Sequence, residues 1–171
     1  LGGNLCRCTG YKPILDGAQK MFLDKSQDQF DSREPRTIQA LSEIRQSKEE
    51  AGLVAHAGRF FSPRTSEELA NLFFQYPSAK LVAGTTDLAL EITQSLSSFD
   101  ALIAVDRVEE IKTIVDSEEF LSVGAGVSIE ELSCKLVGVY PSLKEVFMRF
   151  GSLQVRNKAT IGGNLGTASP I

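Results

Sequence analysis

The glycine-rich stretch at residues 160–171 is the strongest constraint on how this chain can fold. It combines Gly162, Gly163 and Gly166 with short hydroxyl and amide side chains, which suits a turn whose backbone approaches a phosphate group. At the other end of the chain, residues 6–8 form a Cys-Arg-Cys motif, and its two thiolates suit iron or zinc. A phosphate-bearing cofactor and a soft metal on one chain indicate electron transfer.

The composition narrows the possible partners. Hydrophobic residues make up 42% of the 171 residues, which is enough for a packed core. A net charge of -4 gives no basic surface, so we expect no nucleic-acid partner, and no apolar run is long enough to cross a bilayer. Three cysteines do not make a disulfide framework and fit a reducing compartment, which predicts a cytoplasmic protein. The chain starts at Leu1 and stops at Ile171 without a polar tail, so we expect a fragment.

The first part of the sequence predicts one helix and then a linker. Residues 11–23 carry Pro13 in the first turn and apolar residues on one face, as is typical of a helix. Residues 24–58 are rich in charged and polar side chains and can bury little area. We interpret them as an exposed linker, with a short surface helix possible around residues 38–45.

Beyond about Arg59 the pattern changes to alternating strands and helices. Two capping boxes, Thr65 with Glu68 and Ser128 with Glu131, predict helix starts. Short apolar runs predict strands at residues 80–83, 101–105 and 120–124. A helical crossover between neighbouring strands favours parallel pairing. The fold class that we predict is α+β.

The thiolate pair is incomplete as a metal site. An iron–sulfur cluster needs four thiolates, and the third cysteine, Cys134, falls on a predicted helix in the other domain. The two missing ligands must lie upstream or on another chain. For a Cys-x-Cys motif taken alone, two small buried residues in a loop are the more common explanation.

A second candidate phosphate site follows the strand at residues 80–83. Residues 81–88 form a strand, a glycine turn and two threonines, and successive backbone N–H groups in such a turn converge on an anion. A helix beginning near Thr86 would add its positive end. An ordinary strand-to-helix turn explains the spacing equally well. Arg156-Asn157-Lys158 is predicted to be a charged turn that needs no function, although it lies close enough in sequence to approach a phosphate.

Residues 3–14, Gly-Asn-Leu-Cys-Arg-Cys-Thr-Gly-Tyr-Lys-Pro-Ile, resemble the second half of the helical two-iron, two-sulfur domain of the xanthine dehydrogenase and aldehyde oxidase family. In that family this cysteine pair joins an earlier Cys-x-x-Cys. Residues 81–88, residues 160–169 and the Phe61 to Leu69 entry resemble the same family's FAD-binding domain, which is of the vanillyl-alcohol oxidase (PCMH) type. Phe150 has the spacing of a FAD-contacting phenylalanine. One departure is Thr85, where a glycine or an asparagine is common.

The resemblance implies three parts: residues 1–23 end the helical 2Fe-2S domain, residues 24–58 are the linker, and residues 59–171 begin the FAD-binding domain. It implies that Cys6 and Cys8 hold one iron. The residues implied to bind FAD are Leu81, Val82, Ala83, Gly84, Thr85, Thr86, Asp87, Leu88, Phe150, Thr160, Gly162, Gly163, Asn164, Thr167 and Ser169.

The implied function is electron relay in a molybdenum hydroxylase, with xanthine dehydrogenase as the first expectation. The molybdenum cofactor would lie on a partner large subunit of a hetero-oligomer, and electrons would pass through 2Fe-2S clusters and FAD to NAD+. No side chain of this chain is expected to act as acid or base. The alternatives are an aldehyde or heteroaromatic hydroxylase of the same family, a non-redox module that binds a phosphate ligand, and an interaction fragment without a ligand. The order of cluster domain and then FAD domain argues against relatives that carry these on separate chains, such as carbon monoxide dehydrogenases.

Overall fold

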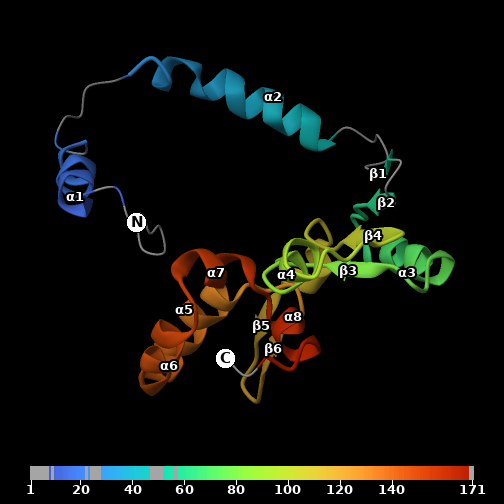
Figure 1. Cartoon of the computed structure of the whole chain (residues 1–171). Helices are drawn as coiled ribbons and strands as arrows, with labels where there is room; N and C mark the ends of the chain where they lie inside the picture. Colours follow the sequence, from blue (N-terminus) through green and yellow to red (C-terminus); the bar gives the residue numbers. More distant parts are fainter. Residues whose placement is uncertain are drawn as a thin grey trace. The chain divides into compact units, whose positions relative to one another are not determined.

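The computed structural model describes residues 8, 10–21, 23, 28–46, 52–55 and 58–169 (Figure 1). The chain divides near residue 50 into two compact units. The described part of the first unit is helical, and that of the second combines a four-stranded sheet, a two-stranded sheet and short helices. None of the helices in the described residues is both long and apolar enough to cross a membrane.

The first unit contains α1 (Tyr11–Lys20), a 3-10 turn (Asp31–Arg33) and α2 (Glu34–Gln46). Helix α1 is shorter than the predicted range of 11–23, because the chain leaves the helix after the Met21 N–H donates to the Gly17 carbonyl at 3.0 Å. Met21 and Leu23 are 67% and 80% exposed, so neither of these two side chains packs to hold a further turn in place.

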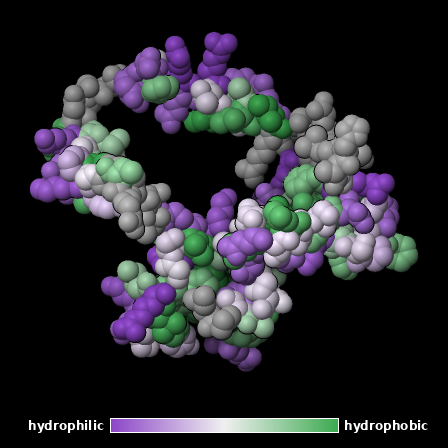
Figure 2. Space-filling model, in the orientation of Figure 1, coloured by the Kyte–Doolittle hydropathy of each residue, from purple (hydrophilic) through white to green (hydrophobic). Residues whose placement is uncertain are grey.

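The stretch predicted as a linker contains more regular structure than expected. Helix α2 spans 13 residues, and strand β1 (Gly52–Ala55) follows it. Helix α2 is held by local contacts such as the side-chain hydrogen bond from Gln39 to Glu43, and its apolar residues Ile38 and Leu41 stay exposed. Figure 2 shows this helix with hydrophobic residues gathered on one side and hydrophilic residues on the other. The short surface helix considered for residues 38–45 is therefore present, and it is longer than that range.

The second unit begins with a sheet in the order β1-β2-β4-β3. Strand β1 pairs with β2 (Gly58–Phe61) in an antiparallel arrangement, whereas β4 (Ala101–Ala104) pairs in parallel with both β2 and β3 (Lys80–Val82). Helix α3 (Ser66–Gln75) makes the crossover from β2 to β3. The parallel pairing and the strands expected at residues 80–83 and 101–105 are confirmed.

The core of this sheet lies between β4 and α3. Ile103 is fully buried, and Leu69 and Leu72 of α3 pack against it. The rings of Phe61 and Tyr76 stack with centroids 4.8 Å apart. The apolar face of α3 therefore packs against the sheet next to β4.

Both predicted helix starts are confirmed. The Thr65 hydroxyl accepts from the Glu68 N–H at 3.1 Å, and the Ser128 hydroxyl accepts from the Glu131 N–H at 3.1 Å. The Glu68 carboxylate accepts from the Arg64 N–H at 2.7 Å, rather than from the Thr65 N–H that a capping box would use. Local capping chemistry therefore sets where α3 and α5 begin.

The rest of the unit is a hairpin followed by helices. The hairpin pairs β5 (Ile114–Asp116) with β6 (Leu121–Val123), and β5 was missed in the sequence because its three residues show no clear alternation. The strand expected at residues 120–124 is confirmed as β6. The remaining helical elements are α4 (Leu88–Thr93), a 3-10 turn (Glu109–Lys112), α5 (Ile129–Val139), a 3-10 turn (Pro141–Leu143), α6 (Lys144–Arg149), α7 (Leu153–Lys158) and α8 (Ile161–Gly166).

Candidate functional site

The two segments predicted to cradle a phosphate lie side by side. The first is the turn between β3 and α4, and the second is α8 with its flanking residues. The Thr167 hydroxyl donates to the Asp87 carboxylate at 3.2 Å and joins them across 80 positions of sequence. Two motifs that were recognised separately therefore belong to one site.

A pocket of about 380 Å³, here called the main pocket, lies between these segments. Its volume is within the range of small-molecule sites. All but two of the predicted cofactor-binding residues line it, the exceptions being Val82 and Gly162. The lining residues are Leu81, Ala83, Gly84, Thr85, Thr86, Asp87, Leu88, Phe150, Gly151, Val155, Ala159, Thr160, Gly163, Asn164, Thr167 and Ser169.

The first wall offers backbone donors. Within the described part of the chain, no hydrogen bond from the N–H groups of residues 84–88 to a protein acceptor is found. Helix α4 begins at Leu88 rather than near Thr86, and its N-cap residue Asp87 makes no side-chain cap. Successive N–H groups without acceptors are a binding surface for an anion. This wall can thus bind a phosphate without a lysine or an arginine.

The second wall differs from the expected turn. Residues 161–166 form helix α8, because the Thr160 hydroxyl accepts from the Gly163 N–H at 3.1 Å. The Ile161 N–H donates to the Val127 carbonyl at 3.0 Å, and the Gly162 N–H donates to the Ala125 carbonyl at 2.8 Å. The first amides of α8 are therefore already satisfied by protein. This wall offers a ligand the side chains of Asn164, Thr167 and Ser169 and an open glycine surface, not backbone N–H groups.

The three glycines of the motif have three different surroundings. Gly163 lines the main pocket. A Cβ on Gly162 would lie 2.7 Å from the Ala125 Cβ, so this glycine allows α8 to approach residue 125. A Cβ on Gly166 would meet nothing within 4 Å. Of the three, only Gly163 is placed where the absence of a side chain leaves room for a ligand.

The residues that line the main pocket carry little charge. Asp87 is the one charged residue among the residues that line the main pocket, and its carboxylate is turned to α8 through the hydrogen bond from Thr167. No arginine or lysine contributes to the described lining. An anion bound here would be stabilised by amides and hydroxyls.

The pocket wall formed by residues after Phe150 is not predicted by the sequence. Gly151, Val155 and Ala159 line the pocket and belong to a turn and to α7. The signal was present in Ser152, whose hydroxyl accepts from the Val155 N–H at 3.3 Å and starts α7. Gly151 has a φ of 52°, in the left-handed region that glycine favours.

The prediction of a charged turn at residues 156–158 is wrong. These residues end helix α7, and Arg156 is buried with 8% of its surface exposed. Its Nε donates to the Glu130 carboxylate at 2.5 Å. A half-buried carboxylate partner on α5 holds this arginine in the interior, which a sequence alone does not reveal.

Of the two predicted metal ligands, the structure describes one. Cys6 lies outside the described residues, and Cys8 is exposed just before α1. Among the described residues, no group of three or more His, Cys, Asp or Glu side chains could hold a metal ion. Cys134 is exposed on α5.

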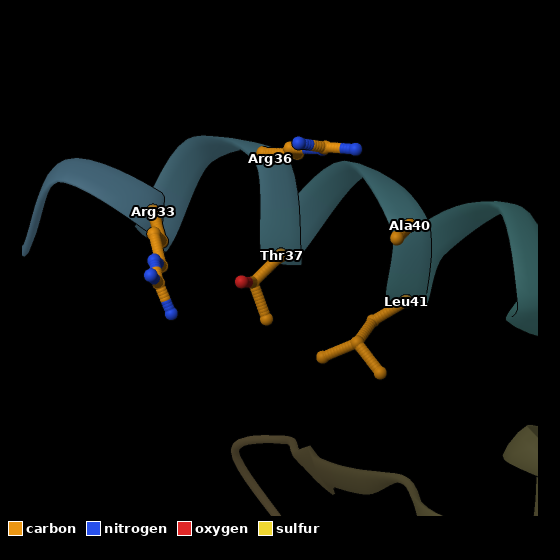
Figure 3. Close-up of a pocket in the computed structure, with 5 residues that line it drawn as sticks. All are labelled: Arg33, Arg36, Thr37, Ala40 and Leu41. Carbon is orange, nitrogen blue, oxygen red and sulfur yellow. The ribbon is translucent and has the colours of Figure 1, made fainter. Parts of the chain in front are cut away.

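A second hollow lies on the first unit. It is lined by Arg33, Arg36, Thr37, Ala40 and Leu41, all from one continuous helical stretch. Figure 3 shows Arg33, Thr37 and Leu41 pointing to one side of the helix and Arg36 lying on the other. One side of a single surface helix does not enclose a ligand, so the main pocket is the candidate site.

Comparison with known proteins agrees with this geometry. Residues 54–171 match the family described as the FAD binding domain in molybdopterin dehydrogenase. The xanthine dehydrogenase/oxidase of Gallus gallus is 28% identical over 99% of this chain and 17% of its own length. The aldehyde oxidase of Homo sapiens is 26% identical over 99% of this chain and 16% of its own length. The carbon monoxide dehydrogenase structure from Hydrogenophaga pseudoflava is similar with a TM-score of 0.58 and 25% identity, covering 66% of this chain and 40% of that chain.

This chain belongs to the family of FAD-binding domains of molybdopterin dehydrogenases, the molybdenum hydroxylase family that includes these relatives. It spans less than a fifth of the length of the curated relatives named above. The alignment with the Gallus gallus protein runs over 236 positions, more than the 171 residues of the chain, so that relative carries additional residues within the matched region.

Proposed function

We propose that the main pocket binds FAD and that this chain is the electron-exit part of a molybdenum hydroxylase. The observation that carries the proposal is the hydrogen bond between Thr167 and Asp87, which unites both glycine-rich segments around one pocket. The N–H groups of residues 84–88 fit the pyrophosphate, because they are successive amides for which no protein acceptor is found among the described residues. The open surface at Gly163, the amide of Asn164 and the ring of Phe150 fit the flavin side of the cofactor.

The role of the chain in this proposal is binding and orientation. FAD, when bound, supplies the redox chemistry, accepting electrons singly and giving them up as a hydride. The protein holds the pyrophosphate with amides, excludes water with Leu81, Phe150 and Val155, and keeps the two walls together through Asp87 and Thr167. No side chain is required to move a proton.

We propose further that Cys6 and Cys8 bind one iron of a two-iron, two-sulfur cluster whose other ligands come from outside this chain. The support is the resemblance of residues 3–14 to that domain. In this assignment Cys6 and Cys8 would hold a cluster that supplies one-electron transfer, and the molybdenum cofactor would lie on a large partner subunit or domain. The complete assembly is cytoplasmic.

Xanthine dehydrogenase is the particular activity that we propose: hydroxylation of hypoxanthine and xanthine to urate with water as the oxygen source, and transfer of two electrons to NAD+. The 28% identity to the Gallus gallus enzyme supports it, and the 26% identity to human aldehyde oxidase supports an aldehyde hydroxylase as the second candidate. Substrate selection lies in the molybdenum part, which this chain does not contain.

The test is a cofactor titration of the complete protein. After removal of flavin, the protein should bind FAD in a 1:1 ratio, and FMN, which lacks the pyrophosphate and adenosine, should bind more weakly. Anaerobic xanthine should then bleach the flavin absorption, and NAD+ should restore it. Absence of FAD binding would refute the proposal, whereas bleaching by an aldehyde and not by xanthine would replace only the substrate.

A further inference from the structure

We infer that the partly buried ion pair of Arg156 and Glu130 positions the Phe150 wall of the main pocket, and that this pair, rather than any residue touching the ligand, fixes how the aromatic ring meets it. The inference rests on the proposed function, because it assigns the occupant of the pocket as FAD. Neither residue lines the pocket.

The contacts of Arg156 lead directly to the pocket wall. One guanidinium nitrogen, Nη1, donates to the Phe150 carbonyl at 3.2 Å and to the Gly151 carbonyl at 3.2 Å. The residues that own those carbonyls both line the pocket. The backbone there turns sharply, with Phe150 extended at ψ 99° and Gly151 at φ 52°. A single guanidinium that holds both carbonyls therefore fixes the turn from which the Phe150 ring projects.

Glu130 holds the guanidinium in turn. Its carboxylate accepts from Arg156 Nε at 2.5 Å, and the two side chains are 10% and 28% exposed. Glu130 lies in the first turn of α5, which is itself joined to the pocket by the hydrogen bond from the Ile129 N–H to the Ala159 carbonyl at 2.8 Å. The charge of Arg156 is compensated in the interior, and its five donors allow it to contact a carboxylate and two carbonyls together.

A second arginine–glutamate pair, close in sequence to Phe150, serves as the control. Arg149 pairs with Glu145 at 2.5 Å one residue before Phe150, but the two side chains are 79% and 73% exposed. That pair lies on the surface of α6, and within the described residues it makes no hydrogen bond to a residue of the pocket. Arg149→Met thus removes the same side chain beside the same phenylalanine without touching the turn.

The experiment compares Arg156→Met, Arg156→Lys, Glu130→Gln and Arg149→Met in the complete protein. We measure the Kd for FAD, the visible circular dichroism of the flavin at saturating FAD, and the melting temperature of the flavin-free protein. Arg156→Met should raise the Kd about tenfold or more and change the flavin spectrum, since the ring beside the flavin loses its fixed orientation. Arg156→Lys should be intermediate, because one ammonium group cannot reach the carboxylate and both carbonyls. Arg149→Met should match the wild type in Kd and spectrum.

A double-mutant cycle separates positioning from general destabilisation. In a Phe150→Ala background there is no ring to position, so Arg156→Met should change the Kd by no more than about twofold. Additive effects, or a lower melting temperature with an unchanged flavin spectrum and Kd, would overturn the inference and leave Arg156 a structural residue. If Arg156→Met does not fold, Arg156→Lys takes its place in the cycle with the same criteria. If Phe150→Ala leaves both the Kd for FAD and the flavin spectrum unchanged, the ring does not meet the ligand and the inference is overturned, whereas absence of FAD binding to the unmodified protein would refute the proposed function.

Discussion

Gly84 packs directly on the backbone carbonyl of Lys158: a Cβ on Gly84 would lie 1.8 Å from that oxygen and 2.4 Å from its carbon. Real Cβ atoms do not approach a neighbour so closely, so position 84 admits glycine alone unless the backbone moves. The contact joins the turn after β3 to the end of α7, and it therefore brings the first wall of the main pocket against the wall that follows Phe150. The need for glycine here comes from protein packing as well as from the proposed approach of a phosphate.

Replacement of Gly84 by alanine should cost about 3 kcal/mol or more of folding stability and abolish FAD retention, because the clash is with backbone atoms that no side-chain rotation relieves. Chemical denaturation and flavin content of the purified protein measure both effects. Gly138→Ala is the control: a Cβ there meets nothing within 4 Å, and the residue lies inside helix α5 rather than in a turn. It should be neutral or stabilise by about 0.5–1 kcal/mol. Equal effects of the two substitutions would contradict the packing argument.

Replacement of Thr85 should stabilise the folded protein. Its φ is 63°, a left-handed conformation that is costly for a β-branched residue. Asparagine tolerates this conformation, so Thr85→Asn should raise the free energy of unfolding by about 1 kcal/mol, measured by urea denaturation without flavin. Thr86→Asn is the control, because Thr86 is not among the described residues with positive φ. A gain from the control, or a loss from Thr85→Asn, would mean that the turn conformation is not the source of strain.

Much of the fold could be predicted because its signals are local. Thr65 and Ser128 start helices through hydrogen bonds to a residue three positions on, and the apolar runs of β3 and β4 are visible in the sequence. The sequence of each glycine-rich segment also predicts phosphate binding, although it does not show that the two segments lie close together. What brings them together, the contact of Asp87 with Thr167, is a property of the tertiary structure.

The parts that escaped prediction depend on partners distant in sequence. Residues 161–166 look like a turn because of their glycines, yet they form α8 because Ala125 and Val127 accept their N–H groups. Arg156 looks like a solvated charge, yet it is buried because Glu130, 26 residues earlier, compensates it. The sequence shows only that Thr85 departs from the usual glycine or asparagine, whereas its φ of 63° in the structure shows that this position is strained.

The cluster assignment makes a separate prediction. In the complete protein, Cys6→Ser should remove the iron and acid-labile sulfide of one cluster while FAD stays bound, because the two sites belong to different compact units. Cys134→Ser, an exposed position on α5, should lose neither cofactor. The isolated 171-residue chain should hold no complete two-iron cluster, since it provides two of the four thiolates needed. Stoichiometric iron and sulfide on the isolated chain, or joint loss of FAD in Cys6→Ser, would contradict the assignment.

The sharpest test of the FAD site uses two glycines of one helix. Gly163 and Gly166 both belong to α8, but Gly163 lines the main pocket and Gly166 does not. Valine has a slightly higher intrinsic helix propensity than glycine, and the change is the same at both positions, so the local backbone effect is matched. At position 163 the new side chain also occupies the pocket and presses on the Thr160 hydroxyl, which would lie 3.0 Å from the added Cβ.

Overpacking of this kind costs about 1–3 kcal/mol, so Gly163→Val should weaken FAD binding by roughly 5- to 150-fold relative to Gly166→Val. Flavin fluorescence titration of the complete protein measures the ratio. Electron transfer from substrate to NAD+ should fall with flavin occupancy in Gly163→Val, while reduction of an artificial acceptor that draws from the clusters should persist. Equal FAD affinity in the two variants would remove FAD from α8 and with it the orientation of the cofactor proposed for this pocket.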